Sequence, residues 1–494
     1  MKKKLFKRMV VLLATLAVLA QPAQASETQK LDAYYSLALR YIETGEYDRA
    51  LNYINACFDY FDEAEDTDLA ADLYLKRACV YTMQDEDEAA LQDLDKTLEL
   101  APDTANAYLV RTQIYSDSGL YSDAIENMEK YIELTDDQSM YQTLAQLYEA
   151  SGDYESALSS YDTYTASTDV GETEASYQRG VYKMDLGLYS EAIEEFNGLT
   201  GDETYGISAL YNIGVCNMNV QSYDEALEAF GKCIEAGGEF DGLYYNRGVC
   251  EMTQGDYEAA IADFTTSVDS ESYAEDALYN RAICEMSSGK YSEAVSDFTT
   301  YLGQDENTGI EQKDNDIALY YRAVCEMSIP DYDAAVADFT ACMDAGIMAE
   351  DSLFNRGLSY LQNENAEAAI ADFTACIDQT ATAQDASKID STDTADEVAI
   401  DTPIADADTN DETQLTGNTD AEAVSTSSRT DEARYYRSFA YRMQEDYDSA
   451  LADLTSCIDN GYDPGQSYYQ RAQTYLAMGD EDHYYEDLES SLNY

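Results

Sequence analysis

The sequence is short of the residue types that most catalytic and nucleic-acid-binding sites need. Its 494 residues include one histidine, His483, and only 28 lysines and arginines against 99 aspartates and glutamates. A single imidazole cannot form a zinc-binding histidine pair, and the chain has neither a phosphate-binding Gly-Lys loop nor a Gly-x-Ser-x-Gly turn. We therefore expect a non-catalytic protein with no metal site and no cofactor.

The shortage of basic residues also bears on the partners. The formal net charge is −71, so nucleic acid and anionic lipid should be repelled. One interpretation is simply a solvated acidic surface. The functional alternative is attraction of basic partners or loose binding of cations.

Long hydrophobic runs are equally scarce. The one that stands out, Met9–Ala20, follows a start in which five of the first eight residues are basic, and it is too short to span a membrane. Residues 23–25 read Ala-Gln-Ala, which fits the small-x-small cleavage pattern. We expect residues 1–25 to be a cleavable signal peptide. The mature chain should then start near Ser26, be secreted or extracytoplasmic (periplasm or cell exterior), and have no membrane segment after cleavage.

What the chain has in abundance is internal repetition. One alanine recurs, mostly at intervals of 33 to 35 residues: Ala50, Ala90, Ala124, Ala157, Ala192, Ala226, Ala260, Ala294, Ala335, Ala369 and Ala450. A tyrosine usually stands three residues before this marker alanine, and a glycine two residues before the tyrosine. Each period holds two apolar stretches with helical spacing, separated by the Gly-x-Tyr turn. Such units stack, because neither helix pair buries its face alone.

These signatures resemble the tetratricopeptide repeat (TPR) family, from about Leu31 to Tyr494, although the family's tryptophan in the first helix is absent. The resemblance implies an all-α, right-handed solenoid of about twelve helix-turn-helix repeats. Repeats 1–10 should occupy residues 26–380 and repeats 11–12 residues 431–494. Residues 381–430 between them are acidic, aperiodic and free of aromatic residues, so we expect a disordered linker there.

An arginine lies thirteen residues before the marker in nine repeats, and eight of these carry an acid three residues after the marker. Repeats without the arginine also lack the acid. We interpret the pair as an Arg–carboxylate bond that ties the two helices of a repeat together. The alternative is a row of arginines that bind a ligand.

The ten cysteines follow the repeat as well, mostly ten residues before or seven after the marker. This spacing favours small buried residues over a disulfide framework. The best disulfide candidate is Cys233–Cys250.

The candidate binding surface is a trough, because the resemblance implies a concave face lined by the first helices. Positions fifteen, eleven and eight residues before the marker share one helix face. The residues at the first of these positions are aromatic, a series of amides adjoins them, and methionines occupy the third position: Tyr177, Tyr211, Tyr245, Tyr279, Tyr320, Phe354, Tyr435, Tyr469, Asn212, Asn246, Asn280, Asn355, Met218, Met252 and Met286. Alternatively, these side chains pack neighbouring first helices against one another.

The sequence thus favours an exported, non-catalytic TPR scaffold that binds protein or peptide partners, basic ones included, in the trough. The alternative is a protein that binds cell-wall or capsule carbohydrate, since tyrosine faces stack on sugars. No nucleic-acid partner is expected.

Overall fold

The computed structural model describes residues 27–63, 65–270, 272–303, 312–387 and 426–494. Those residues form 24 α-helices and two short 3₁₀-helices, with no strand among them. The proposed signal peptide and residues 388–425 of the proposed linker lie outside the described part. The all-helical expectation is confirmed.

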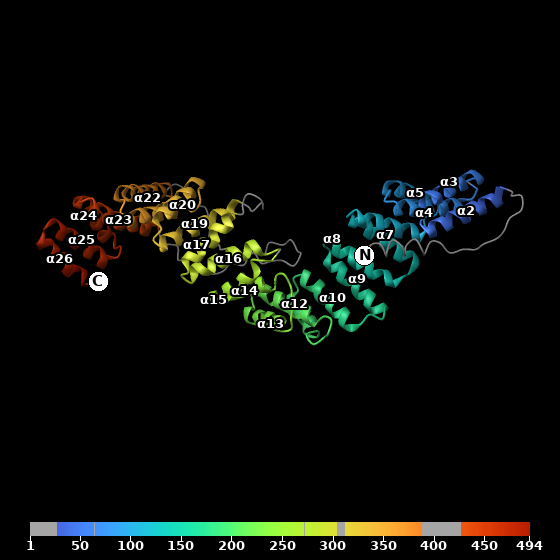
Figure 1. Cartoon of the computed structure of the whole chain (residues 1–494), viewed down its shortest axis with the longest axis horizontal. Coiled ribbons are helices and arrows are strands. Elements are labelled where there is room, and N and C mark those ends of the chain that lie inside the picture. Colours follow the sequence, from blue (N-terminus) through green and yellow to red (C-terminus); the bar gives the residue numbers. More distant parts are fainter. Residues whose placement is uncertain (1–26, 64, 271, 304–311, 388–425) are drawn as a thin grey trace. The chain divides into compact units, whose positions relative to one another are not determined.

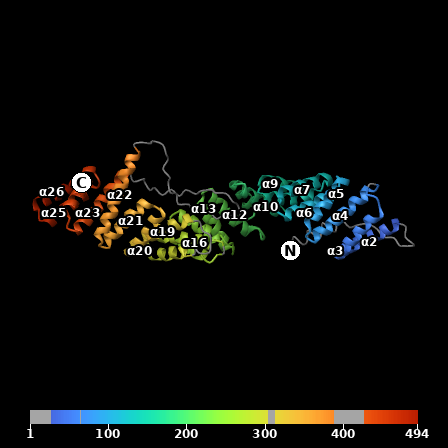
Figure 2. The ribbon, with the colours of Figure 1, turned by 90° about the horizontal axis from the view of Figure 1, so that it is seen from above.

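The α-helices alternate along the chain as first and second helices of successive repeats, and the chain divides into two compact units between Val220 and Gln221. Helices follow one another in chain order within each unit (Figures 1 and 2). The first unit contains α2 (Glu27–Thr44), α3 (Tyr47–Cys57), α4 (Thr67–Met83), α5 (Asp87–Leu100), α6 (Ala105–Asp117), α7 (Tyr121–Thr135), α8 (Tyr141–Ser151), α9 (Tyr154–Ser167), α10 (Glu172–Asp185), α11 (Tyr189–Asn197) and α12 (Gly206–Asn219), with η1 (Phe58–Tyr60) and η2 (Gln138–Met140).

The second unit continues the same alternation. It contains α13 (Tyr223–Glu235), α14 (Leu243–Thr253), α15 (Tyr257–Ser267), α16 (Ala274–Ser287), α17 (Tyr291–Leu302), α19 (Gln312–Ser328), α20 (Tyr332–Ala345), α21 (Ala349–Gln362), α22 (Ala366–Ser387), α23 (Thr426–Met443), α24 (Tyr447–Asn460), α25 (Pro464–Met478) and α26 (Glu481–Ser491). Both α22 and α23 extend into the segment that we expected to be a linker.

The turn inside each repeat forms for local reasons. Gly152 ends α8 with a φ of 82°, in the left-handed region that glycine enters without a steric penalty. Asp153 then caps α9, because its carboxylate accepts a hydrogen bond from the backbone N–H of Ser156 at 3.1 Å. The repeated tyrosine is the first residue of the second helix, as Tyr154 is in α9.

The marker alanines lie where two helices approach most closely, and all eleven are fully buried. Small residues on the first helix serve the same purpose. A Cβ added to Gly180 would lie 2.7 Å from the Phe196 ring, so this glycine lets α10 and α11 come together. Phe196 itself is fully buried, as are its repeat equivalents Phe230, Phe264, Phe298, Phe339 and Phe373.

The proposed Arg–carboxylate bonds are confirmed. Seven arginines hold an aspartate with Nε and Nη2 at N–O distances of 2.5–3.0 Å: Arg77–Asp93, Arg247–Asp263, Arg281–Asp297, Arg322–Asp338, Arg356–Asp372, Arg437–Asp453 and Arg471–Asp487. In the eighth pair, Arg179 and Lys183 share Glu195 at 3.4 and 3.0 Å.

The arginine does more than the sequence predicted, since it also joins neighbouring repeats. Arg281 Nη1 donates to the hydroxyl of Thr265, which lies on the second helix of the preceding repeat, at 3.2 Å. Four further arginines bond a threonine of the preceding repeat in the same way: Arg322–Thr299, Arg356–Thr340, Arg437–Thr374 and Arg471–Thr455. One guanidinium therefore connects three helices.

All ten cysteines are buried and none is disulfide-bonded. No disulfide joins Cys233 and Cys250, the candidate pair. Burial raises the pKa of Cys233 to about 11 and that of Cys250 to about 12. The prediction that cysteine serves here as a small packing residue is confirmed.

Candidate functional site

The structure distributes the fifteen predicted trough residues between interior and surface. Six are buried: Tyr245, Phe354, Asn212, Asn246, Asn280 and Met218. Eight are partly buried: Tyr177, Tyr211, Tyr279, Tyr320, Tyr435, Asn355, Met252 and Met286. Tyr469 is exposed. The predicted ladder is therefore not one continuous binding surface.

Tyr245 shows what the buried members do instead. Its ring stacks on Tyr273 with centroids 4.9 Å apart, and its hydroxyl accepts a hydrogen bond from Asn280 Nδ2 at 3.1 Å. Asn355 donates to the Tyr320 hydroxyl in the same way, at 3.0 Å. In both pairs the residues lie 35 positions apart, so the amide of one repeat holds the tyrosine of the repeat before it. These amides are packing contacts between first helices, the alternative stated above.

A different arrangement surrounds Tyr177, which borders a hollow of ≈ 520 Å³ in the first unit. Its walls are the first helices of two consecutive repeats, α8 and α10, with Tyr161 of α9 and Tyr205 just before α12. Tyrosine, glutamine and glutamate make up almost all of the lining: Gln142, Gln146, Glu149, Ala150, Tyr161, Glu174, Tyr177, Gln178, Tyr182 and Tyr205. We take this hollow as the candidate site and call it the Tyr177 hollow.

The hollow exists because α8 departs from the repeat pattern. The three trough positions hold Tyr177, Val181 and Met184 in the next repeat, but Gln142, Gln146 and Glu149 in α8. Flexible polar side chains take the places of apolar residues that fill this space elsewhere. The polar residues Gln142, Gln146 and Glu149 are visible when the repeats are aligned. The predicted trough did not include them because it was defined by the residue types that the repeats have in common.

Four tyrosines form the aromatic part of the lining, and two of them stack on each other. The rings of Tyr177 and Tyr205 stack with centroids 4.8 Å apart and an interplanar angle of 26°. Tyr205 occupies the same repeat position as Tyr273, which stacks on Tyr245. The stack is thus a recurring device, fully buried at Tyr245 and open to the hollow at Tyr177.

The electrostatics of the hollow are negative. The Tyr182 hydroxyl donates to Glu149 Oε2 at 3.0 Å. Burial, followed by the charge of Glu149, raises the pKa of Asp185 to about 6. Burial, followed by the charge of Glu174, raises the pKa of Tyr161 to about 12. No lysine or arginine is among the lining residues.

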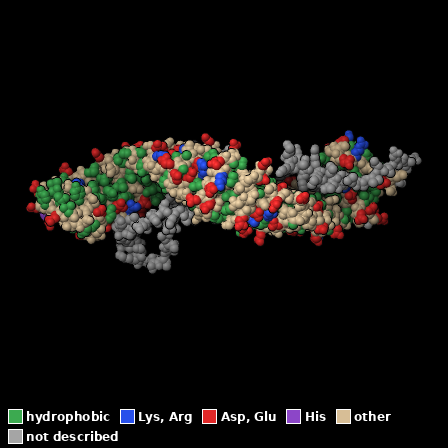
Figure 3. All heavy atoms as spheres, turned by 90° about the horizontal axis from the view of Figure 1, so that it is seen from below, with side chains coloured by type: hydrophobic (Ala, Val, Ile, Leu, Met, Phe, Trp, Pro, Cys, Tyr) green, Lys and Arg blue, Asp and Glu red, His purple; other side chains and the backbone are tan. Residues whose placement is uncertain are grey.

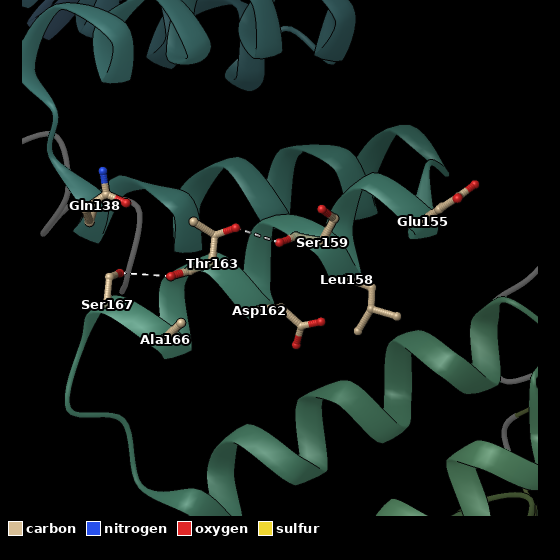
Figure 4. Close-up of a pocket in the computed structure, with 8 residues that line it drawn as sticks. All are labelled: Gln138, Glu155, Leu158, Ser159, Asp162, Thr163, Ala166 and Ser167. Carbon is tan, nitrogen blue, oxygen red and sulfur yellow. Dashed lines mark hydrogen bonds between the residues drawn. The ribbon is translucent and has the colours of Figure 1, made fainter.

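A second hollow, of ≈ 730 Å³, lies along α9 and contains no aromatic residue (Figure 4). Two of its three hydroxyl groups are already used inside the helix, because Thr163 donates to the carbonyl of Ser159 and Ser167 donates to that of Thr163. Compared with the Tyr177 hollow, it offers few groups that could hold a ligand.

The C-terminal end of the second unit presents an apolar surface, where hydrophobic side chains gather in Figure 3. Four large apolar residues on α23 and α25 are 42–46% exposed: Met443, Tyr469, Leu476 and Met478. Of the predicted trough residues, Tyr469 lies here.

Three glutamates form a further group that the sequence analysis overlooked. Glu251, Glu285 and Glu326 each follow the repeat arginine by four positions, and each has a buried Oε2 without a hydrogen-bond partner. Burial raises the pKa of each to about 7. The triplet Cys-Glu-Met at residues 250–252, 284–286 and 325–327 could have revealed them.

Within the described part of the chain, no group of three or more His, Cys, Asp or Glu side chains is arranged to hold a metal ion. Among the same residues, no helix combines the length and the apolar composition that crossing a bilayer requires.

Comparison with solved structures returns other repeat proteins. A tetratricopeptide repeat protein from Parabacteroides merdae is 18% identical, with a TM-score of 0.37, over 51% of this chain and 99% of its own. The C-terminal part of a TPR protein from Cytophaga hutchinsonii is 19% identical, with a TM-score of 0.41, over 47% and 93%. YrrB, described as a TPR protein with an unusual peptide-binding site, is 25% identical, with a TM-score of 0.30, over 35% and 91%.

A sequence search of curated proteins found no match. Two sequence profiles described as tetratricopeptide repeat do match. One covers residues 143–205, 218–275, 245–307 and 279–347, and the other residues 31–61 and 350–381. Together these stretches span about half of the chain, in both units, and they agree with the observed helix pairs. The chain therefore belongs to the tetratricopeptide repeat family.

Proposed function

We propose that the chain is an exported, non-catalytic scaffold and that the Tyr177 hollow holds a segment of a partner protein. The observation that carries this proposal is the hollow itself, which opens between two first helices where the apolar trough residues are replaced by polar ones. The TPR fold is in general a scaffold for protein–protein interaction.

Two features of the sequence complete the proposal. The leader at residues 1–25 supports export, so the partner should be met outside the cytoplasm. The formal net charge of −71 favours a basic partner over an acidic one, because like charges repel during encounter.

Carbohydrate remains the second candidate, on one specific observation. The hollow places a tyrosine stack beside three glutamines, and aromatic faces with neighbouring amides suit sugar rings and their hydroxyls. A neutral glycan would bind independently of salt. A basic protein should bind more weakly as salt rises, because exposed charges are screened within about 8–10 Å near physiological ionic strength.

The test uses the full chain and the variant Tyr177→Ala. Binding is measured against envelope proteins from the source cell and against a glycan array, at low and high salt. Tyr485→Ala is the control, since Tyr485 is 63% exposed and lies on α26, far along the chain from the hollow. We expect a salt-sensitive protein partner that Tyr177→Ala loses and Tyr485→Ala keeps. Salt-insensitive glycan binding with the same dependence on Tyr177 would favour the second candidate. Binding unaffected by Tyr177→Ala would show that the Tyr177 hollow is not the binding site.

A further inference from the structure

The Tyr177 hollow has an unbalanced charge. Two of its lining residues, Glu149 and Glu174, are carboxylates, and none of the lining residues is basic. Two cations do lie nearby in sequence, on α10, but they point elsewhere. Lys183 Nζ contacts Glu195 of α11 at 3.0 Å, and Arg179 Nε contacts the same carboxylate at 3.4 Å.

Helix geometry explains this separation. Glu174, Gln178 and Tyr182 are spaced four apart, so they share the face of α10 that borders the hollow. Arg179 and Lys183 are also four apart, but they lie on the face that packs against α11. The chain therefore neutralises Glu195 internally and leaves the carboxylates of the hollow without a cation among the residues that line it.

The aromatic wall points to the same chemistry. A cation held over a tyrosine face is attracted by the ring's negative centre, and the attraction grows when water is excluded. Here the stacked rings of Tyr177 and Tyr205 line the same hollow as Glu149 and Glu174. Aromatic faces together with carboxylates form a combination that binds a guanidinium or an ammonium group better than a neutral or anionic group.

We infer that the Tyr177 hollow receives a cationic side chain of the partner segment, with arginine preferred over a neutral residue of the same shape. This inference rests on the proposed function, because it assigns a ligand chemistry to the same site. In this arrangement the guanidinium stacks on the tyrosine wall while Glu149 and Glu174 accept its hydrogen bonds. Gln142, Gln146 and Gln178 are placed to bond the neighbouring peptide backbone.

General attraction to a chain of net charge −71 must be separated from this specific site. The probe is a Gly/Ser peptide with one central arginine, compared with the same peptide carrying citrulline, which keeps the shape and loses the charge. Affinities are measured on the full chain by ligand-observed NMR at physiological salt. The site variant is Glu149→Gln with Glu174→Gln. The control is Glu194→Gln with Glu203→Gln, which removes the same charge from two exposed residues outside the hollow.

We expect the arginine peptide to bind the unmodified chain and the control alike, and the site variant about tenfold or more weakly, as loss of charge-assisted hydrogen bonds predicts. The citrulline peptide should bind weakly to all three. Equal losses in the site variant and the control would overturn the inference, since net charge alone would then explain binding. If the double site variant unfolds, Glu174→Gln alone keeps the test decisive, because Glu174 is exposed.

The inference and the proposed function can fail separately. Arginine and citrulline peptides that bind equally would overturn the inference, while an envelope partner lost in Tyr177→Ala would still support the proposed function. Conversely, arginine binding that depends on the hollow would uphold the chemistry assigned here. The proposed function would nevertheless fail if no partner of either class depended on Tyr177.

Discussion

At the scale of single residues, the repeat arginine is the best example of a role that follows from the sequence. Its acid partner appears and disappears with it across repeats, and covariation within one chain indicates contact. The bidentate geometry confirms that interpretation. The threonine bonds to the preceding repeat were missed, because a lone hydroxyl at one position carries no charge signature.

Removing one arginine should therefore destabilise its repeat. Arg281→Leu leaves Asp297 largely buried without its partner, and we expect a loss on the order of 1–3 kcal/mol in the free energy of unfolding. Adding Asp297→Leu should recover part of this loss. Chemical denaturation of the unmodified chain, the Arg281→Leu and Asp297→Leu single variants and the double variant measures the coupling energy. Strictly additive effects would show that the two side chains do not interact.

The matched comparison is the exposed pair Lys232–Glu228, whose side chains are 56% and 66% exposed. Solvent and salt screen such a pair, so Lys232→Leu should change stability by less than about 1 kcal/mol. A similar loss at both sites would mean that burial does not set the strength of these bonds.

Tyrosines were harder to place from the sequence. Tyr177 and Tyr245 occupy the same repeat position, yet one borders a hollow and the other is fully buried. Gln142 of the preceding first helix, α8, borders the same hollow as Tyr177, whereas Tyr245 packs with Phe264 and with Ala277 of the following repeat. A residue's exposure in a stacked array depends on its neighbour's sequence, so position alone does not determine it.

This difference predicts which tyrosines carry stability. Tyr245→Ala should cost about 3–5 kcal/mol, because it opens a cavity in the interior and leaves Asn280 without its acceptor. Tyr469→Ala should cost less than about 0.5 kcal/mol, since the ring is 42% exposed. Thermal melts followed by circular dichroism would check both, and equal costs would contradict the assigned burial.

At the scale of elements, the helix boundaries followed closely from the sequence. In six repeats the Gly-x-Tyr turn marks where the first helix ends and the second begins, as at Gly152 and Tyr154. In others a different residue, such as Asp85 or Glu364, adopts the positive φ at the glycine position. The sequence analysis did not predict that α14, α16 and α19 each bury a glutamate beside an Arg–Asp pair. Arg247 Nε lies 2.5 Å from Asp263 Oδ2 but 3.8 Å from Glu251 Oε1. The guanidinium therefore pairs with the aspartate and not with the glutamate.

These three glutamates should make the second unit more stable in mild acid. Their pKa rises from 4.5 to about 7, first because of burial and next because of the charge of Asp263, Asp297 or Asp338. The folded chain then binds more protons than the unfolded chain between these values. The stabilisation is complete below about pH 4.5 and is lost as the pH rises through about 7, by on the order of a few kcal/mol for each glutamate.

Unfolding midpoints measured between pH 5 and pH 8 test this sign. Replacing the three with glutamine should flatten the pH dependence, because glutamine mimics the protonated form: Glu251→Gln, Glu285→Gln and Glu326→Gln. A control removes three exposed charges from the same unit: Glu225→Gln, Glu235→Gln and Glu350→Gln. A pH profile that the control flattens equally would assign the effect to net charge.

At the scale of the whole molecule, charge is the dominant property and it could be read from composition alone. Acidic residues outnumber basic ones by more than three to one. Eight of the basic residues are the arginines of the Arg–carboxylate pairs, and their side chains are only 15–25% exposed. They therefore neutralise carboxylates in the interior more than carboxylates on the surface. The surface is correspondingly more acidic than the ratio suggests.

Self-repulsion of this kind predicts that salt stabilises the fold. Raising NaCl from about 0.01 M to about 0.3 M shortens the screening length from roughly 30 Å to below 8 Å, which weakens repulsion between exposed carboxylates. The partly buried Arg–Asp bonds are screened far less. We expect the melting temperature to rise with salt, and to rise equally in tetramethylammonium chloride. A fall would mean that exposed ion pairs contribute more than the repulsion costs.

The paired arginines also bear on resistance to proteolysis. Proteases of the trypsin type cut after lysine and arginine, and they need an extended, accessible stretch of backbone around the cut. In the described repeats, each paired arginine lies inside a helix and is held by up to three bonds, as Arg281 is. Cleavage there must wait for local unfolding. The chain has few basic residues, and the paired arginines lie inside helices. While the repeats remain folded, trypsin-type proteases therefore find few accessible cleavage sites there.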